Sequence, residues 1–310
     1  MRILKLVLMV FSIFFLTSQV LGYKVRIGLL PILESLTVHI AKEKGYFPSE
    51  FEVEIVPVGS AAERDQLLAS GEIDIVINDL LAVALFNSKR IQLYVIGTSA
   101  KAVKGSPMFF LLSSPKSGIS KLEQVKGIPI AVSENTLPHY VIEKILESNG
   151  FKPSEISFLP IPRIPDRMSA LISDRVKAAV LPDPLAFLAL KEGCNLILED
   201  SQYDYSIDVF SARKEFLDRY PQVVSGFLSA IYKAVNEIYT NREWAKEMLV
   251  ERKLLPPSLK ESYGIPDYLS RSFSLPSPSQ WQEVLKWLKK RQLLEDDIPY
   301  EKVFYRSKGS

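Results

Sequence analysis

GEIDIVINDLLAVALF, residues 71–86, has a pattern of apolar and polar residues that recurs about a hundred residues later. Ile73–Ile77 is a short apolar run typical of a buried strand, and Asn78 and Asp79 separate it from an apolar helix start. A second stretch of the same kind, DRVKAAVLPDPLAFLAL, spans residues 174–190. Laid over each other, Ile75–Asp79 falls on Ala179–Asp183 at an offset of 104 residues.

The segments before these two stretches repeat at nearly the same distance. Val53–Val58 falls on Ile156–Ile161, and Val25–Leu30 falls on Ile128–Ser133, both at an offset of 103 residues. Repetition on this scale predicts two similar α/β lobes rather than a short-period solenoid. Two such lobes facing each other form a cleft, and the residues at the strand ends line it.

The composition is that of an ordinary globular protein without a polyanionic partner. The 310 residues are enough for two domains. Arg2 and Lys5 lie in the first 22 residues, and without them 36 Lys and Arg face 36 Asp and Glu, a net charge of zero. We therefore expect no nucleic-acid partner.

Residues 1–22 read as a secretory signal peptide. A positive start precedes an apolar run from Leu6 to Leu16 and a more polar stretch, with Gly22 small enough for a cleavage site before Tyr23. The alternative is an uncleaved N-terminal anchor. The single cysteine, Cys194, lies far from this segment, so lipid attachment at a mature N-terminal cysteine is excluded. We expect a periplasmic or extracellular protein that is not a lipoprotein.

Strands and helices alternate along both halves of the chain, which predicts parallel sheets covered by helices on both faces. Met108–Ser113 is expected to carry the chain into the second lobe, and Tyr205–Ala212 to return it. The predicted first lobe therefore comprises residues 23–104 and 206–310, including the C-terminal helices, and the second lobe comprises residues 105–205.

The order and spacing of these segments resemble a known family. VRIGLLP, HIAKEKGYF, VEIVPVGS and LLASGEIDIVIND, followed by LEQVKGIPIAVSENTLPHYVIEKILESNG and FLDRYPQVVSGFLSAIYKAVNEIYTN, cover about residues 24–250. They are similar to ABC-transporter substrate-binding proteins of the nitrate/sulfonate/taurine and thiamine-precursor (SsuA/THI5-like) group. The resemblance implies a type II periplasmic-binding-protein fold, two α/β lobes that close on a small solute. It also implies an ABC permease in the membrane as partner, and we expect a monomer.

Polar side chains follow several of the predicted strands. In parallel α/β sheets, ligands bind beyond the carboxyl ends of the strands, where helix N-termini present free N–H groups. We therefore expect a cleft lined by nine ligand-binding residues: Glu34, Asn78, Asp79, Ser99, Asn135, Thr136, His139, Asp183 and Asp208.

Several of these residues also have a purely structural interpretation. Asp79 and Asp183 stand directly before helices, and Asp183 followed by Pro184 is a favoured N-cap with proline at the first helical position. Glu34 suits a helix N-terminus. His139 lies in the first turn of a helix, where its ring faces either the cleft or the protein surface.

The acidic candidates indicate the chemistry of the ligand. Nitrate and sulfonates are bound by helix N-termini and by cationic or neutral donors. A cleft that contains Glu34, Asp79, Asp183 and Asp208 instead favours N–H donors or positive charge. We expect a small nitrogenous organic solute, pyrimidine-like or related; the alternative is a sulfonate, taurine or nitrate binder.

An enzymatic function is the less favoured alternative. Pyrimidine-synthesis and menaquinone-pathway enzymes share the fold that the resemblance implies, but the latter are cytoplasmic, which the signal segment opposes. One Cys and two His provide no metal cluster, and P-loop, GxSxG and HExxH motifs are missing from the sequence. We expect a binder without catalytic residues, metal or cofactor, although a sensing domain for a membrane receptor would have the same sequence features.

Overall fold

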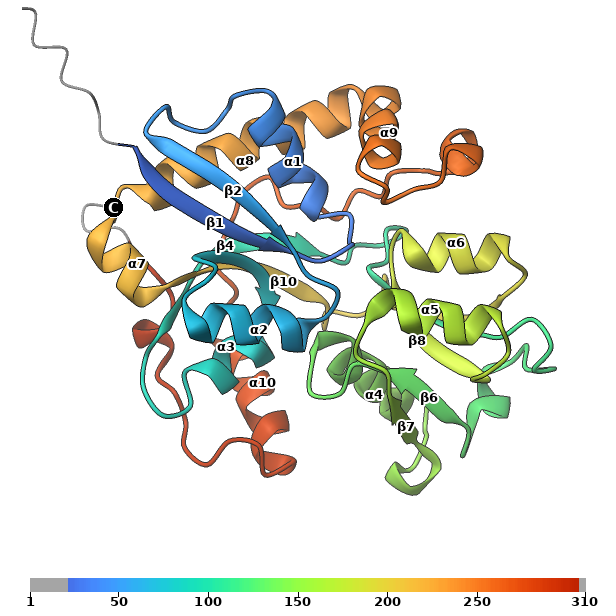
Figure 1. Cartoon of the computed structure of the whole chain (residues 1–310). Coiled ribbons are helices and arrows are strands. Elements are labelled where there is room, and N and C mark those ends of the chain that lie inside the picture. Colours follow the sequence, from blue (N-terminus) through green and yellow to red (C-terminus); the bar gives the residue numbers. More distant parts are fainter. Residues whose placement is uncertain (1–21, 307–310) are drawn as a thin grey trace, which may run out of the picture.

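A computed structural model describes residues 22–306 and contains two five-stranded sheets, each with its own helices (Figure 1). The two-lobed α/β architecture predicted from the repeat is confirmed. Residues 1–21 of the predicted signal peptide lie outside the described residues. Within residues 22–306 no helix combines the length and the apolar character that crossing a membrane requires.

The first lobe is built on a sheet with the strand order β2-β1-β3-β10-β4. Its helices α1, α2 and α3 each connect consecutive strands of the chain. The bounds are β1 Tyr23–Leu29, α1 Ser35–Glu43, β2 Phe51–Pro57, α2 Ala61–Ser70, β3 Ile75–Asp79, α3 Leu80–Phe86, β4 Leu93–Lys101 and β10 Ile207–Arg213.

The second lobe is built on a sheet with the strand order β7-β6-β8-β5-β9. In Figure 1 it lies to the right of the first lobe and is coloured green to yellow. The bounds are β5 Phe109–Ser113, η1 Leu122–Val125, β6 Pro129–Val132, α4 Leu137–Ser148, η2 Pro153–Glu155, β7 Ser157–Pro160, α5 Ile164–Ile172, β8 Ala178–Pro182, α6 Leu185–Lys191 and β9 Asn195–Glu199.

Both sheets are mixed rather than parallel, which corrects the prediction from the alternating pattern. The strands β2, β1 and β3 are parallel, as are β7, β6 and β8. However, β10 is antiparallel to β3 and β4, and β5 is antiparallel to β8 and β9. Both exceptions are the strands with which the chain enters a lobe from the other one, and neither is joined to its neighbour by a helical crossover.

The strand register also corrects the alignment of the repeat. Ile27 pairs with Ile75 in the first sheet. In the second sheet Ile130, 103 residues after Ile27, pairs with Ala178, 103 residues after Ile75. The offset therefore stays at 103 through the third strand, and the position equivalent to Asp79 is Pro182 rather than Asp183.

The C-terminal third of the chain packs mainly on the first lobe. Helix α8 lies against α1, and α10 against α3. Isolated bridges join Val95 to Phe304 and Ala100 to Leu269. This segment therefore also pairs with β4, the edge strand of the first sheet. The bounds are α7 Lys214–Arg219, α8 Val223–Thr240, α9 Arg242–Glu251, η3 Pro257–Ser262, α10 Pro278–Lys290 and η4 Tyr300–Lys302.

The two connections between the lobes are fastened to each other by one buried side chain. Asp200 follows β9, and its Oδ1 accepts hydrogen bonds from the backbone nitrogens of Met108 at 2.8 Å and Phe109 at 3.1 Å, at the start of β5. Its Oδ2 accepts from the hydroxyl of Ser206, at the start of the return to the first lobe. The carboxylate therefore holds the outgoing and the returning connection together.

Candidate functional site

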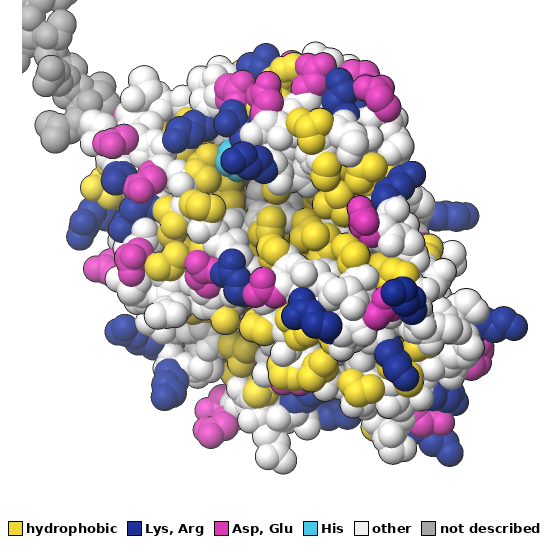
Figure 2. Space-filling model, turned by 45° about the vertical axis from the view of Figure 1, so that its right-hand side comes forward, with side chains coloured by type: hydrophobic (Ala, Val, Ile, Leu, Met, Phe, Trp, Pro, Cys, Tyr) yellow, Lys and Arg dark blue, Asp and Glu magenta, His cyan; other side chains and the backbone are white. Residues whose placement is uncertain are grey.

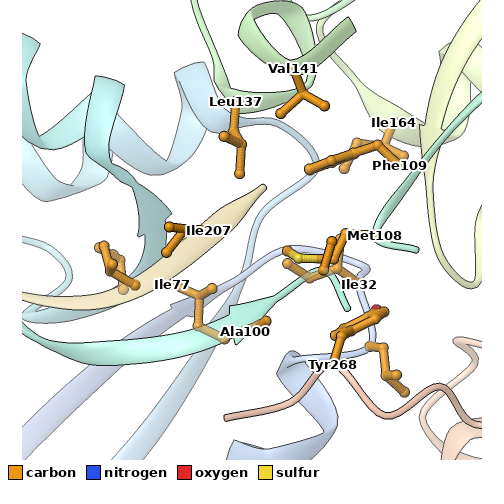
Figure 3. Packing of buried hydrophobic residues seen from close by; sticks show 14 of the residues in the cluster. Ile32, Ile77, Ala100, Met108, Phe109, Leu137, Val141, Ile164, Ile207 and Tyr268 are labelled. Carbon is orange, nitrogen blue, oxygen red and sulfur yellow. The ribbon is translucent and has the colours of Figure 1, made fainter. Parts of the chain in front are cut away.

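A small cavity lies between the lobes, at the carboxyl ends of the parallel strands. Its volume is about 60 Å³, room for only a few water-sized groups. In Figure 3, Leu137, Phe109 and Ile164 of the second lobe face Ile32, Ile77 and Tyr268 of the first, with Met108 between them. Polar residues complete the wall: Glu34, Arg64, Asn78, Asp79 and Asp208 from the first lobe, and Ser133, Thr136 and Arg167 from the second.

Contacts between the lobes close the cavity. The backbone nitrogen of Leu137 donates to Asp79 Oδ2 at 3.3 Å, and that of Ile164 donates to the carbonyl of Gly59 at 3.2 Å. At the rim, Arg163 pairs with Glu63 at 3.2 Å. These contacts hold the two lobes together around the cavity.

Glu34 and Asp208 form a pair of buried carboxyl groups in the cavity wall. Glu34 holds the N-cap position of α1 but makes no capping hydrogen bond with its side chain, so helix capping does not explain it. Burial raises the pKa of Glu34 to about 7. Burial, together with the charges of Glu34 and Asp79, raises the pKa of Asp208 well above its usual value. Burial therefore disfavours the ionised form of both groups, and their carboxyl oxygens can accept hydrogen bonds from an N–H group.

Asp79 both caps a helix and lines the cavity. Its Oδ1 accepts from the backbone nitrogen of Ala82 in the first turn of α3 at 2.8 Å, while Oδ2 reaches Leu137 in the other lobe. Burial raises the pKa of Asp79 although Arg64 stabilises its charge. The capping and cleft interpretations of Asp79 thus both describe its position.

Two donors at the cavity have no hydrogen-bond partner among the described residues. Asn78 Oδ1 accepts from the hydroxyl of Ser211 at 2.7 Å, but its buried Nδ2 is unpartnered. Arg64 donates from Nη1 to the carbonyl of Ile77 at 3.1 Å and from Nε to Asp65 at 2.8 Å, whereas Nη2 is unpartnered. A buried donor without a partner costs free energy, so both atoms favour a ligand acceptor.

Sequence reasoning missed Arg64 and its counterpart in the second lobe, Arg167. Arg167 lies 103 residues after Arg64, and it donates from Nε to the carbonyl of Val180, 103 residues after Ile77, at 2.7 Å. Burial lowers the pKa of Arg167 to about 10, which keeps it charged at neutral pH. The 103-residue offset of the repeat relates the two arginines to each other. An arginine in a helix is usually exposed, however, so its residue type alone does not predict a place in a buried site.

His139 is not at the cavity, and the prediction that its ring faces the cleft is wrong. The ring packs edge-on against Phe158 and Trp287, with centroids 4.3 Å and 5.3 Å away. Its Nδ1 accepts from the backbone nitrogen of Asn135 at 2.9 Å, and Nε2 lies 3.0 Å from Arg291. Burial and Arg291 lower the pKa of His139 to about 3, so the ring is neutral and structural.

Asp183 is not a helix cap, which corrects the second structural interpretation. Pro184 holds the N-cap position of α6, and no side chain caps this helix. The Asp183 carboxylate instead accepts from the hydroxyl of Tyr263, in the C-terminal third of the chain. Burial, aided by the charge of Glu34, raises the pKa of Asp183 to about 7.

The remaining predicted residues divide between the cavity wall and the interior. Thr136 lines the cavity, and its hydroxyl donates to the carbonyl of Ser133 at 2.6 Å. Asn135 and Ser99 lie off the wall, Ser99 with a buried, unpartnered hydroxyl. Tyr268 was not predicted, because a long proline-containing loop brings it back to the cavity from far along the chain.

An open groove of about 980 Å³ lies outside the cavity and shares the side chain of Leu30 with it. It is lined from both lobes, with Arg163 and Pro165 from the second. Figure 2 shows a hollow with an apolar floor on this face of the molecule, with basic side chains around it.

Comparison with known proteins identifies one family. The model of the NMT1/THI5-like family matches residues 34–245. A search of curated protein sequences returns no match.

Solved structures with this fold include binding proteins from three bacteria. The alkanesulfonate-binding protein SsuA from Xanthomonas axonopodis pv. citri, bound to MOPS, has a TM-score of 0.77 and 16% identity, over 92% of this chain and 98% of that one. The aliphatic sulphonate-binding protein SsuA from Escherichia coli has a TM-score of 0.72 and 17% identity, over 91% and 92%. The nitrate-binding protein NrtA from Synechocystis PCC 6803 has a TM-score of 0.69 and 16% identity, over 91% and 86%. At these identities the likeness shows a shared fold.

Proposed function

The chain belongs to the NMT1/THI5-like family, and we propose that it is the exported solute-binding component of an ABC importer. The family match, the signal-like N-terminus and a closed cavity between two lobes support this role. The protein acts as a monomer that holds a small nitrogenous organic solute, pyrimidine-like or related, and presents it to a permease in the membrane. The lobes correspond to residues 23–104 with 206–310, and to residues 105–205.

The observation that carries the choice of solute is the carboxyl pair of Glu34 and Asp208. Both groups are buried in the cavity wall, with Asp79 close enough to raise the pKa of Asp208. A buried negative charge without a partner is costly, and an ammonium, amidine or ring N–H group removes that cost. Nitrate or an alkanesulfonate without an amino group would leave it in place.

Binding couples to closure of the lobes. The first lobe supplies most of the charged groups, and the solute contacts these first. Closure then brings Phe109, Leu137 and Ile164 towards the solute, and the lobes turn about the connections fastened by Asp200. Because the cavity of about 60 Å³ is smaller than a pyrimidine ring, the lobes of the loaded form stand further apart than in this structure. The solute stabilises the closed form by as much as it binds that form more tightly than the open one.

A binding role fits the site better than catalysis. His139 is buried away from the cavity, and Cys194 is buried in the second lobe. Residues 22–306 contain no group of three His, Cys, Asp or Glu side chains able to hold a metal ion. The cavity groups are a carboxyl pair, two arginines and an amide, which are suited to recognition.

Thermal-shift screening of the full chain tests the proposal. The panel contains aminopyrimidines, small amines, taurine, alkanesulfonates, nitrate and flavins, because a ligand that binds the folded protein raises the melting temperature by mass action. We expect shifts with compounds that carry N–H donors. A response limited to nitrate or to alkanesulfonates without an amino group would contradict the proposed solute class.

A matched pair of variants places the response in the cavity. Asp208→Asn should reduce the shift produced by N–H donors, since it removes one buried carboxyl group. Asp204→Asn is the control, because Asp204 lies only a few residues earlier but is exposed and pairs with Lys101 at 2.7 Å. Equal effects of the two substitutions would argue against binding at the carboxyl pair.

A further inference from the structure

Two buried arginines, one from each lobe, line the same cavity as the carboxyl pair. From Arg64 and Arg167 we infer that the solute is amphoteric: besides its N–H or cationic group it carries an oxyanion, such as a carboxylate, held between these two guanidinium groups. This inference rests on the proposed binding function and names the class of solute more narrowly.

Two hydrogen bonds hold the Arg64 side chain in position, and one of its nitrogens has no partner among the described residues. Its side chain is 2% exposed, and its bonds to Asp65 and the carbonyl of Ile77 engage Nε and Nη1. The unpartnered Nη2 belongs to a residue of the cavity wall, as does the unpartnered Nδ2 of Asn78. Two buried donors without acceptors therefore lie at one cavity, and an oxyanion offers acceptors to both.

Arg167 repeats this arrangement in the second lobe. Its side chain is 1% exposed, and it donates from Nε to the carbonyl of Val180 and from Nη1 to the carbonyl of Ile161, both at 2.7 Å. Its Nη2 makes no hydrogen bond with the described residues, although, unlike Arg64 Nη2, it is not a fully buried atom. Within residues 22–306 no carboxylate, the usual partner of a buried guanidinium, forms an ion pair with Arg167.

The charged side chains around the cavity are of both signs: Arg64 and Arg167 are guanidinium groups, and Glu34, Asp79 and Asp208 are carboxyl groups. Arg64 already has a carboxylate partner, Asp65 at 2.8 Å, whereas Arg167 has none among residues 22–306. A purely cationic solute would satisfy the carboxyl pair and leave Arg167 unpaired, whereas a simple anion would do the reverse. A solute with both groups satisfies both sides.

The position of the arginines on opposite lobes gives the oxyanion a role in closure. Arg167 lies on α5, whose first residue, Ile164, contacts Gly59 of the first lobe in the closed form. An oxyanion already bound to Arg64 gains its second guanidinium when the lobes close. The forked geometry of arginine suits this shared contact, because carboxylates accept two hydrogen bonds from one guanidinium.

Calorimetry with matched sets of small molecules tests the inference on the full chain at pH 7. One set is β-alanine, propylamine and propanoate; the other is 4-aminopyrimidine-5-carboxylate, 4-aminopyrimidine and pyrimidine-5-carboxylate. We expect the amphoteric member of at least one set to bind tenfold or more tightly than both of its truncated partners. Equal binding of the amine lacking the carboxylate would overturn the inference, as would failure of both amphoteric compounds to bind.

Variants separate recognition of the oxyanion from a structural role. Arg167→Gln should weaken binding of the amphoteric compound about tenfold to hundredfold while changing binding of its amine less than twofold, and Arg167→Lys should restore part of the loss. Arg26→Gln is the control, because Arg26 pairs with Asp74 away from the cavity. A loss equal for both compounds would mean that Arg167 only supports the fold and would overturn the inference.

The experiments distinguish failure of the proposed nitrogenous solute from failure of the inferred oxyanion group. If bare amines bind as tightly as amphoteric compounds, the proposed nitrogenous solute stands and the second oxyanion site does not. If only compounds without N–H groups bind, the proposed solute class is itself wrong.

Discussion

The two lobes share one topology but give the cavity different chemistry. Strand orders β2-β1-β3 and β7-β6-β8 are equivalent, and so are the registers of their parallel pairs. Yet the carboxylates of the cavity wall all come from the first lobe, while the second contributes mainly apolar side chains and Arg167. The two lobes thus have their strand ends at equivalent positions, but the residues at those positions differ.

Two pairs of equivalent positions show which features persist in both lobes. Arg64 and Arg167 are the same residue, and each donates to the carbonyl of the central strand beneath it. This bond attaches a helix to the sheet, which either lobe needs for stability. Asp79 and Pro182 differ, so only the first lobe has a carboxylate at this position of the cavity wall.

The largest effect on the free energy of unfolding should come from removing a charge from the carboxyl pair of the first lobe. Because burial raises the pKa of Glu34 from 4.5 to about 7, the folded protein binds protons more tightly than the unfolded chain. Its free energy of unfolding should therefore fall as pH rises through this interval, by on the order of 3 kcal/mol for a shift of this size. Asp208→Asn should weaken that fall and make the protein more stable than wild type at pH 8.

Urea unfolding at pH 4 and pH 8 measures this effect. At pH 4 the wild type and Asp208→Asn should be about equally stable, since the carboxyl groups are protonated in the native state. A variant that is less stable than the wild type at pH 8 would show that the pair is not under charge strain.

A smaller effect should follow from removing the contact between the lobes at Asp79. Asp79→Ala loses the cap of α3 and leaves the backbone nitrogen of Leu137 without its acceptor, together about 2 kcal/mol of unfolding free energy. Asp79→Asn keeps a capping oxygen and should lose less. For Asp79→Ala, the loss of free energy of solute binding should exceed the loss of free energy of unfolding. The opposite order would mean that Asp79 serves only as a helix cap.

The smallest effect should come from Tyr263→Phe, which removes a hydrogen bond from the C-terminal segment to Asp183 of the second lobe. The Tyr263 hydroxyl donates to buried Asp183, so its removal should lower the unfolding free energy by about 1 kcal/mol. The hydroxyl favours the ionised carboxylate, and burial places the pKa of Asp183 near 7. The loss should therefore be greater at pH 8 than at pH 5, and equal losses in urea titrations at the two pH values would contradict this role for Tyr263.

The fold could largely be predicted from the sequence because the repeat lies in the chain itself. Apolar runs followed by polar residues located the strands of both lobes. The direction of β5 and β10 could not be read from these runs. A strand that enters from the other lobe has the same local pattern whichever way it pairs.

The site was less predictable, because its contacts depend on segments far apart in sequence. Glu34, Asp79 and Asp208 reach the cavity because strand ends converge at one edge of a sheet. Asp183 turns to Tyr263, 80 residues away, and His139 packs against Trp287 of the C-terminal helix. Nothing local in the sequence distinguishes such a tertiary partner from a cap or from a ligand.

Calorimetry of solute binding at pH 7, in buffers of different ionisation enthalpy, measures proton release at the carboxyl pair and so tests the central claim most directly. Burial raises the pKa values of Glu34 and Asp208, and a cationic group bound beside them favours their ionised forms, so binding should release protons. Asp208→Asn should lose both this release and most of the affinity. Binding of a solute without N–H donors, with no proton release and with equal affinity for Asp208→Asn, would contradict the claim.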